Sequence, residues 1–258
     1  MSVLGVITCQ TLELEIAHLL VNDPDVQSVT VLKNRYADGL LQALESERSV
    51  LVNTVSYVGA FRPAYPRRVE ALVQIMEVGL HTVITNLRQA VTDAATDMGP
   101  YVDAILLGYG LCGNALEKVE ELLSDTGVPV FMASDEDHPV DDCVALLIGG
   151  RELYYQEQCR CAGTMFMTPG FANHWKQIML KGLTRGYSLE MCKRLMANYE
   201  RVLLLPSEVM SADQMGPSVE EFNDIWGLRT EIGAGTLQIL ERTWRSAKES
   251  VQVKGDLV

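Results

Sequence analysis

Short runs of apolar residues alternate with longer amphipathic stretches along most of the chain. The short runs are typical of buried strands and lie at residues 2–8, 28–32, 104–109, 128–132, 163–168 and 201–205. The amphipathic stretches predict helices at residues 11–22, 37–46, 69–97, 113–123, 143–158, 172–181, 189–199, 219–226 and 233–246. The segment 51–61 is ambiguous, and its Val, Thr and Tyr content favours a strand. This alternation predicts an α/β, Rossmann-like fold in which helices flank a mostly parallel sheet, with the functional site at the C-terminal ends of the strands.

The composition supports one sizeable folded unit. The chain has 258 residues, of which 48% are hydrophobic and 21% charged, and no Pro-, Gly- or Ser-rich linker divides it. We expect a single α/β domain, or two intimately packed subdomains at about residues 1–100 and 101–258. The net charge of −13 argues against nucleic acid or an anionic membrane as partner. Apolar runs of under about 10 residues are too short to span a bilayer, and without a signal-peptide pattern a cytoplasmic location is expected.

Three of the six cysteines follow predicted strands. Cys9 follows VLGVIT, Cys112 follows AILLGYGL, and Cys143 follows VPVFM and an acidic loop. Parallel strands place these ends on one side of the sheet, so the three thiols are expected to converge. Three thiolates suit zinc with an open fourth position, or an iron–sulfur cluster with one open iron. The alternative for each cysteine is a buried small side chain.

The segment around Cys112 offers groups for a ligand pocket. Its glycines, Gly108, Gly110 and Gly113, would let a ligand approach the backbone, and Tyr109 and Asn114 are candidate pocket side chains. A helix beginning after Cys112 would favour its thiolate form.

Two carboxylates adjoin the third cysteine. Asp141 and Asp142 precede Cys143, and either could orient a ligand or accept a proton. Of the histidines, His138 and His174 are the better pocket candidates. The pair Cys159 and Cys161 could form a separate site or lend one thiol to the main one, whereas Cys192 is expected in the core.

The motifs LGYGLCGN, DDCVALLIGGRELY and GTMFMTPGF, together with the early Cys9, resemble a prokaryotic family, number 1638 among the domains of unknown function. Where that family tends to have His before Asp-Cys, this chain has Asp141, so Asp141 or His138 replaces that group or the chemistry differs. The resemblance implies an association with corrinoid-dependent methyl transfer in methanogens and other anaerobes.

Three functions remain open from the sequence. The first is a cysteine-ligated metal protein of methyl or one-carbon metabolism that would act as a metal-dependent transferase, with zinc as metal and a thiol, corrinoid or other small molecule as substrate. The second is a non-catalytic accessory or cofactor-binding module that docks on a corrinoid protein or methyltransferase. The third is a metal-free enzyme with Cys112 as nucleophile. A homo-oligomer is compatible with each.

Overall fold

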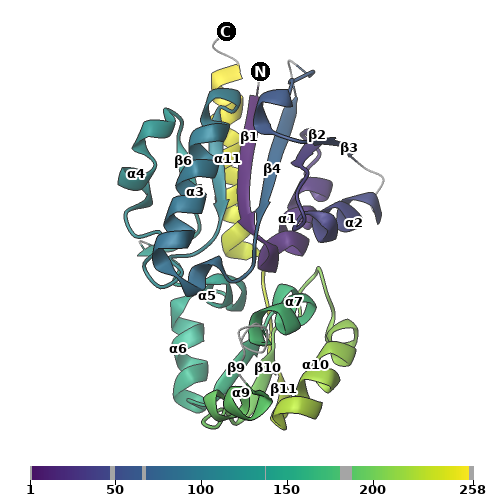
Figure 1. The fold of residues 1–258 in the computed structure, drawn as a ribbon. Coiled ribbons are helices and arrows are strands. Elements are labelled where there is room, and N and C mark those ends of the chain that lie inside the picture. The colour runs from purple at the N-terminus through teal and green to yellow at the C-terminus, as the bar shows by residue number, and fades with distance from the viewer. Residues whose placement is uncertain (1, 47–49, 66–67, 137, 181–187, 256–258) are drawn as a thin grey trace.

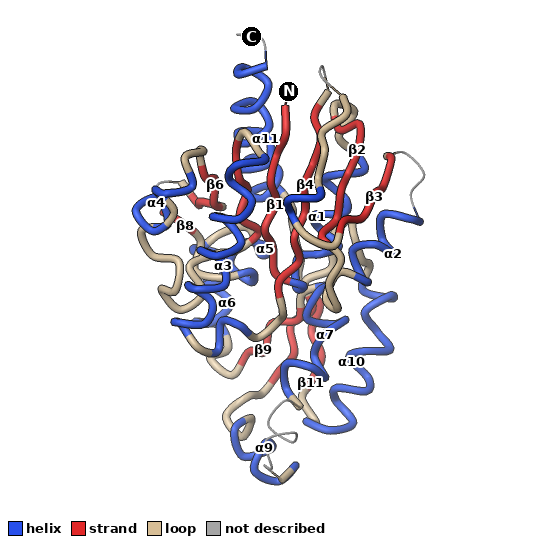
Figure 2. The backbone as a smooth tube through the Cα atoms, turned by 45° about the horizontal axis from the view of Figure 1, so that its top comes forward, coloured by secondary structure: helices blue, strands red, loops and turns tan. Residues whose placement is uncertain are grey.

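The computed structural model describes residues 2–46, 50–65, 68–136, 138–180 and 188–255. Its main feature is a six-stranded parallel sheet with the strand order β3-β2-β4-β1-β5-β6 (Figure 1). The strands are β1 Ser2–Cys9, β2 Val26–Leu32, β3 Leu51–Val55, β4 Val69–Met76, β5 Ala104–Gly108 and β6 Val130–Met132. Helices cover both faces, as Figure 2 shows, so the predicted α/β, Rossmann-like fold is confirmed.

Successive side chains of each buried strand point to opposite faces of the sheet, and each face has its own hydrophobic core. Leu4 and Val6 of β1 pack on one face against four helices, which are α1 Glu13–Asn22, α2 Asp38–Ser46, α5 Cys143–Ile148 and α11 Gln238–Gly255. Val3 and Ile7 pack on the other face against α3 Ile84–Met98 and the segment that contains α4 Val119–Leu122. Because both faces are buried, the strands are continuously apolar rather than alternating.

The prediction of helix throughout residues 69–97 was wrong in its first part. Residues 69–76, VEALVQIM, form β4, which lies between β1 and β2 in the sheet. Glu, Ala, Leu, Gln and Met favour helix, but burial on both faces and pairing on both edges determine the conformation here. The carboxylate of Glu70 is buried and accepts hydrogen bonds from Ser28 Oγ and from the backbone N–H groups of Ala64 and Tyr65.

A smaller lobe, residues 151–235, lies below this sheet in Figure 1. It is built on a three-stranded parallel sheet of order β11-β10-β9. Its elements are α6 Arg151–Arg160, β9 Thr164–Met167, α7 Pro169–Met179, α9 Leu189–Leu195, β10 Arg201–Leu204, α10 Ala212–Trp226 and β11 Arg229–Ile232. The chain then returns to the large sheet as α11, which continues to Gly255, nine residues beyond the end predicted from the sequence at residue 246.

The start of α7, in the smaller lobe, packs against the residues that follow β1 of the large sheet. Thr168 caps α7 by accepting a hydrogen bond from the Phe171 N–H at 3.2 Å. Gly170 lies so close to Thr11 that an added Cβ would stand 2.0 Å from its carbonyl oxygen. On the same helix, His174 Nε2 lies 2.7 Å from Oε1 of Glu13, at the start of α1.

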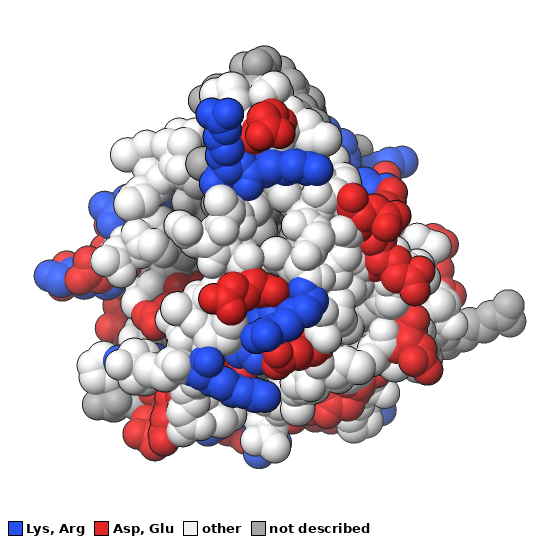
Figure 3. Space-filling view, turned by 90° about the horizontal axis from the view of Figure 1, so that it is seen from below, with Lys and Arg blue, Asp and Glu red and all other residues white. Residues whose placement is uncertain are grey.

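Charges of opposite sign lie beside one another on the face of the smaller lobe seen in Figure 3. Surface pairs in this lobe include Lys176 with Glu221 and Arg194 with Glu190. This mixture provides no extended basic patch for an anionic polymer on that face. Within the described ranges, no helix combines the length and apolarity needed to cross a membrane.

Candidate functional site

Two of the predicted cysteine positions lie at the same edge of the large sheet. Cys9 is the last residue of β1, and β5, which leads to Cys112, is the neighbouring strand. Thr8 pairs with Gly108 at the ends of these strands, and Thr8 Oγ1 donates a hydrogen bond to the Gly108 carbonyl at 3.1 Å. A Cβ at Gly108 would stand 2.1 Å from this hydroxyl oxygen, so the two strand ends fit closely only with glycine there.

Backbone contacts bring the third cysteine to this edge. The Leu111 N–H donates to the Val140 carbonyl and the Cys112 N–H donates to the Asp141 carbonyl, both at 2.8 Å. An added Cβ on Gly110 would stand 2.6 Å from the Val140 carbonyl oxygen, so Gly110 permits this approach. The segment after β5 therefore lies along the segment that leads into Cys143.

A cavity of about 620 Å³ lies between this edge and the smaller lobe. Among its lining residues are eight of the ten predicted site residues, namely Cys9, Cys112, Cys143, Gly108, Gly110, Gly113, Tyr109 and Asp142. Asp141 and Asn114 are not among the described residues of the wall. The wall also includes Thr11 and His81, which no sequence motif singled out.

The three thiols are close enough to perturb one another. Burial raises the pKa of Cys112 to about 12, with a smaller contribution from Cys9. Burial also raises the pKa of Cys143 well above its ordinary value, and Asp142, Cys112 and Cys9 raise it further. The pKa of Cys9 is raised by burial and lowered in part by hydrogen bonds with Thr11, whose side chain also bonds Cys143. Thr11 is thus a shared neighbour of two of the thiols.

The helix expected to begin directly after Cys112 does not form there. Residues 112–117 make turns, and α4 is a four-residue helix that starts only at Val119. Cys112 and Asn114 have positive φ angles of 48° and 66°, which a helix excludes. Gly113 between them also has a positive φ, and this run prevents helix formation. A helix end does not stabilise a Cys112 thiolate, and burial dominates its pKa.

Asp142 has a clear structural role. It is the N-cap of α5, and its Oδ1 accepts hydrogen bonds from the N–H groups of Val144 at 2.9 Å and Ala145 at 2.8 Å. Burial raises its pKa, while these two hydrogen bonds and the charge of His81 oppose the rise. This cap fixes the start of α5 and so the position of Cys143.

Tyr109 lines the same cavity and lies near Cys9 and Cys112. Its side chain is buried, and its hydroxyl has no hydrogen-bond partner in the part of the chain that the structure describes. Burial, then the nearby Cys9 and Cys112, raise its pKa well above 10, so the hydroxyl remains a donor. A buried donor without an acceptor is costly, and a bound ligand or a thiolate would supply the acceptor.

The donor chemistry of this cavity suits a thiophilic metal ion, since three thiols and one carboxylate line it. Over the described residues, no three His, Cys, Asp or Glu side chains are arranged so that they could hold a metal ion. Binding by Cys9, Cys112 and Cys143 together would require their side chains to turn toward a common centre.

The other candidate residues lie elsewhere. His174 pairs with Glu13, and His138 is an exposed residue of the short hairpin formed by β7 Ser134–Asp135 and β8 His138–Pro139. Cys161 contacts Glu200 and Arg229 in the smaller lobe, and Cys192 is buried in α9.

Fold and site together define an α/β protein with a cysteine-lined cavity at the C-terminal edge of a parallel sheet. The family described as Protein of unknown function (DUF1638) matches residues 75–244, more than half of the chain, so the chain belongs to this family. No curated protein and no solved structure matches it. Within the matched region, the YGLCGN segment supplies the cavity floor, and the TPGF segment makes the close contact with Thr11.

Proposed function

We propose that this chain binds a thiophilic metal ion, zinc in the first place, through Cys9, Cys112 and Cys143, and uses it on a one-carbon substrate held in the cavity. One observation carries the proposal: three thiols from separate segments line one cavity, close enough that, besides burial, Cys9 raises the pKa of both Cys112 and Cys143. Soft thiolate ligands select zinc or an iron–sulfur cluster over magnesium or calcium.

The raised thiol pKa values favour metal binding over a metal-free nucleophile. With a pKa of about 12, roughly one Cys112 side chain in 10⁵ would be a thiolate at pH 7. A metal ion bound there would compensate for the buried negative charge and deprotonate the ligands. The wall contains no Lys or Arg among the described residues that could take this role.

The other residues of the cavity would hold and orient rather than react. Tyr109 can donate its free hydroxyl hydrogen to a thiolate or to a bound ligand, and Thr11 hydrogen-bonds two of the cysteines. Asp142 fixes Cys143 by capping α5. When bound, a metal with an open position would act as Lewis acid or lower the pKa of a substrate thiol. The association of the family with corrinoid-dependent methyl transfer makes a methylated substrate, a thiol acceptor and a corrinoid protein the first candidates to examine.

Elemental analysis of anaerobically purified protein tests the proposal. We expect about one zinc per chain, lost when Cys9, Cys112 or Cys143 is replaced by Ser. The buried Cys192→Ser variant is the matched control and should keep its metal. A yellow-brown protein that contains iron and sulfide would show that the three cysteines hold an iron–sulfur cluster instead of zinc. Equal metal content in all four variants, or none in the wild-type protein after zinc is supplied, would refute the proposal.

Proton release gives an independent measure of the same site. Because the three thiol pKa values are raised, each bound thiol should lose one proton at pH 7, so zinc binding should release about three protons. The release can be measured by calorimetry in buffers of different ionisation enthalpy. Because each single Cys→Ser replacement is expected to abolish zinc binding, it should also abolish this proton release, whereas Cys192→Ser should keep it.

A further inference from the structure

The cavity has two chemically different ends. The thiols, Tyr109 and Asp142 come from the large sheet and α5. Much of the remaining lining, the aromatic wall, belongs to the smaller lobe. It carries four aromatic rings from four separate segments, which are Tyr154 of α6, Phe166 of β9, Phe171 of α7 and Tyr199 before β10. This aromatic wall shares one cavity with the three thiols and with the carboxylate of Asp142, a combination that metal binding alone does not require.

Three of the four rings are partly exposed, whereas Phe166 is buried. Tyr154 and Phe166 lie with their centroids 5.0 Å apart at an angle of 36°, so they overlap only in part. Tyr154 and Phe171 are half-buried, and Tyr199 is 36% exposed. Aromatic faces carry negative potential and attract cations over the ring.

The charges on the wall also favour a cation. In the described part of the wall the only carboxylate is Asp142, the only basic side chain is His81, and there is no Lys or Arg. A phosphate or carboxylate ligand would therefore lack the guanidinium or ammonium partner that such groups normally have.

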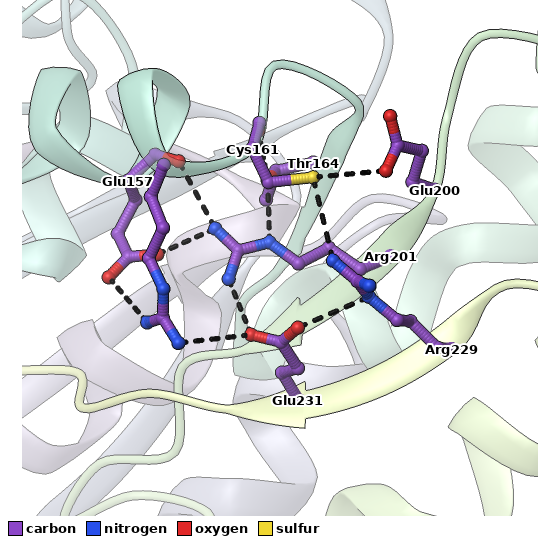
Figure 4. Close-up of polar contacts among 8 residues, drawn as sticks. Glu157, Cys161, Thr164, Glu200, Arg201, Arg229 and Glu231 are labelled. Carbon is purple, nitrogen blue, oxygen red and sulfur yellow. Dashed lines mark hydrogen bonds and ion pairs between the residues drawn. The ribbon is translucent and has the colours of Figure 1, made fainter.

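Arg201, which lies behind Thr164 of the wall, does not add a positive charge to the cavity. Thr164 lines the cavity, and its hydroxyl accepts a hydrogen bond from Arg201 Nε at 2.8 Å (Figure 4). The buried guanidinium of Arg201 also contacts the carboxylates of Glu157 and Glu231, each at 2.6 Å. The two carboxylates neutralise the positive charge of this guanidinium, and the buried side chain is not exposed to the cavity.

We infer that the cavity binds a small organic cation of the alkylammonium type, with its alkyl groups against the aromatic wall and its charge facing the thiol end. The inference rests on the proposed function in one respect, since three thiolates around a divalent metal ion carry a net negative charge that would attract the ligand. The aromatic wall and Asp142 act independently of the metal. The free hydroxyl of Tyr109, buried at the thiol end, adds a donor for any polar group that the ligand carries.

A pair of probes that differ only in charge tests the inference. Choline and its neutral isostere 3,3-dimethyl-1-butanol have nearly the same shape, and each is titrated into the full chain by calorimetry at pH 7. Choline should bind about tenfold or more tightly than the alcohol. Tyr154→Leu should weaken choline about threefold to thirtyfold without affecting the alcohol equally.

The control lies one residue further along the same helix. Tyr155 is 67% exposed and does not line the cavity, so Tyr155→Leu should leave choline binding unchanged. Tyr199→Leu, at the exposed edge of the wall, provides a second variant should Tyr154→Leu fold poorly. Equal binding of both probes, absence of binding by both, or an equal loss in the Tyr155 variant would overturn the inference.

The metal content of the same samples separates this result from the proposed function. Protein that holds metal but binds both probes alike overturns the cationic ligand and leaves the metal site standing. Protein that holds no metal after zinc is supplied, yet binds choline selectively, overturns the metal site and supports the cationic ligand.

Discussion

Glu15 offers the sharpest test of how this chain tolerates buried charge. Its side chain lies in α1 and is fully buried, and neither carboxylate oxygen has a hydrogen-bond partner within the described ranges. Burial raises the pKa of Glu15 from 4.5 to about 8, and the neighbouring Glu13 adds to the rise. The folded protein therefore holds Glu15 protonated at pH 7, whereas the unfolded chain ionises it.

Because of this difference in protonation, the free energy of unfolding decreases as the pH rises. Below pH 4.5 Glu15 is protonated in both the folded and the unfolded state, so its ionisation does not reduce the free energy of unfolding. Between pH 4.5 and about 8 the folded state binds one proton more than the unfolded state, so its stability falls by about 1.4 kcal/mol per pH unit. At pH 7 the accumulated loss is on the order of 3 kcal/mol.

The variant Glu15→Gln removes the ionisation and keeps the shape. Urea unfolding of both proteins at several pH values between 4.5 and 8 gives the difference in their unfolding free energies. That difference should shift in favour of Gln by about 3 kcal/mol from pH 4.5 to pH 7. Any constant effect of burying the amide cancels from this pH dependence.

An exposed glutamate provides the comparison. Glu45 lies on the surface of α2, so Glu45→Gln should follow the wild-type pH profile. Parallel profiles for wild type and Glu15→Gln would refute the reasoning, because they would mean that Glu15 ionises alike in the folded and unfolded chain.

The remaining predictions concern two buried polar contacts, that of His174 with Glu13 and that of Arg201 with its two glutamates. His174→Ala would leave Glu13 buried without its 2.7 Å partner, and urea unfolding at pH 7 should show a loss of about 1–3 kcal/mol. Arg201→Met should destabilise the smaller lobe by about 3 kcal/mol, the low end for a broken buried pair, because Glu157 and Glu231 retain partial exposure. An unchanged unfolding midpoint in either variant would show that its ion pair does not contribute to stability.

The sequence predicts the sheet well where strands are short and apolar. SVLGVIT and AILLG form β1 and β5 at the expected places, and the strand ends bring Cys9 and Gly108 to one edge. The strand β4 was missed because its residues individually favour helix, and only the finished sheet supplies partners on both of its edges. The short edge strand β11, which carries mostly exposed residues, gave no apolar signal at all.

The site is predictable in outline but not in detail. The position of each cysteine relative to a strand end indicates a shared edge, and the cavity includes all three. The turn at Cys112 could not be foreseen, because GNALEKVEELL has helix-forming residues and the hydrogen bonds of Leu111 and Cys112 to the segment before Cys143 exist only in the folded chain. Likewise, no local pattern indicates that residues of the smaller lobe, such as Tyr154 and Phe166, complete the cavity wall.

The arrangement of α11 also bears on how the chain is made. This helix packs on β1, β5 and β6, and Trp244 donates a hydrogen bond to Asp23, a residue 221 positions earlier. During synthesis, β1 emerges from the ribosome before the smaller lobe, whereas α11, one of the helices that cover the Leu4 and Val6 face of the sheet, emerges after it. Until α11 is made, the part of this face that it covers, over β1, β5 and β6, remains exposed, and we expect this intermediate to depend on chaperones that shield apolar surface during translation.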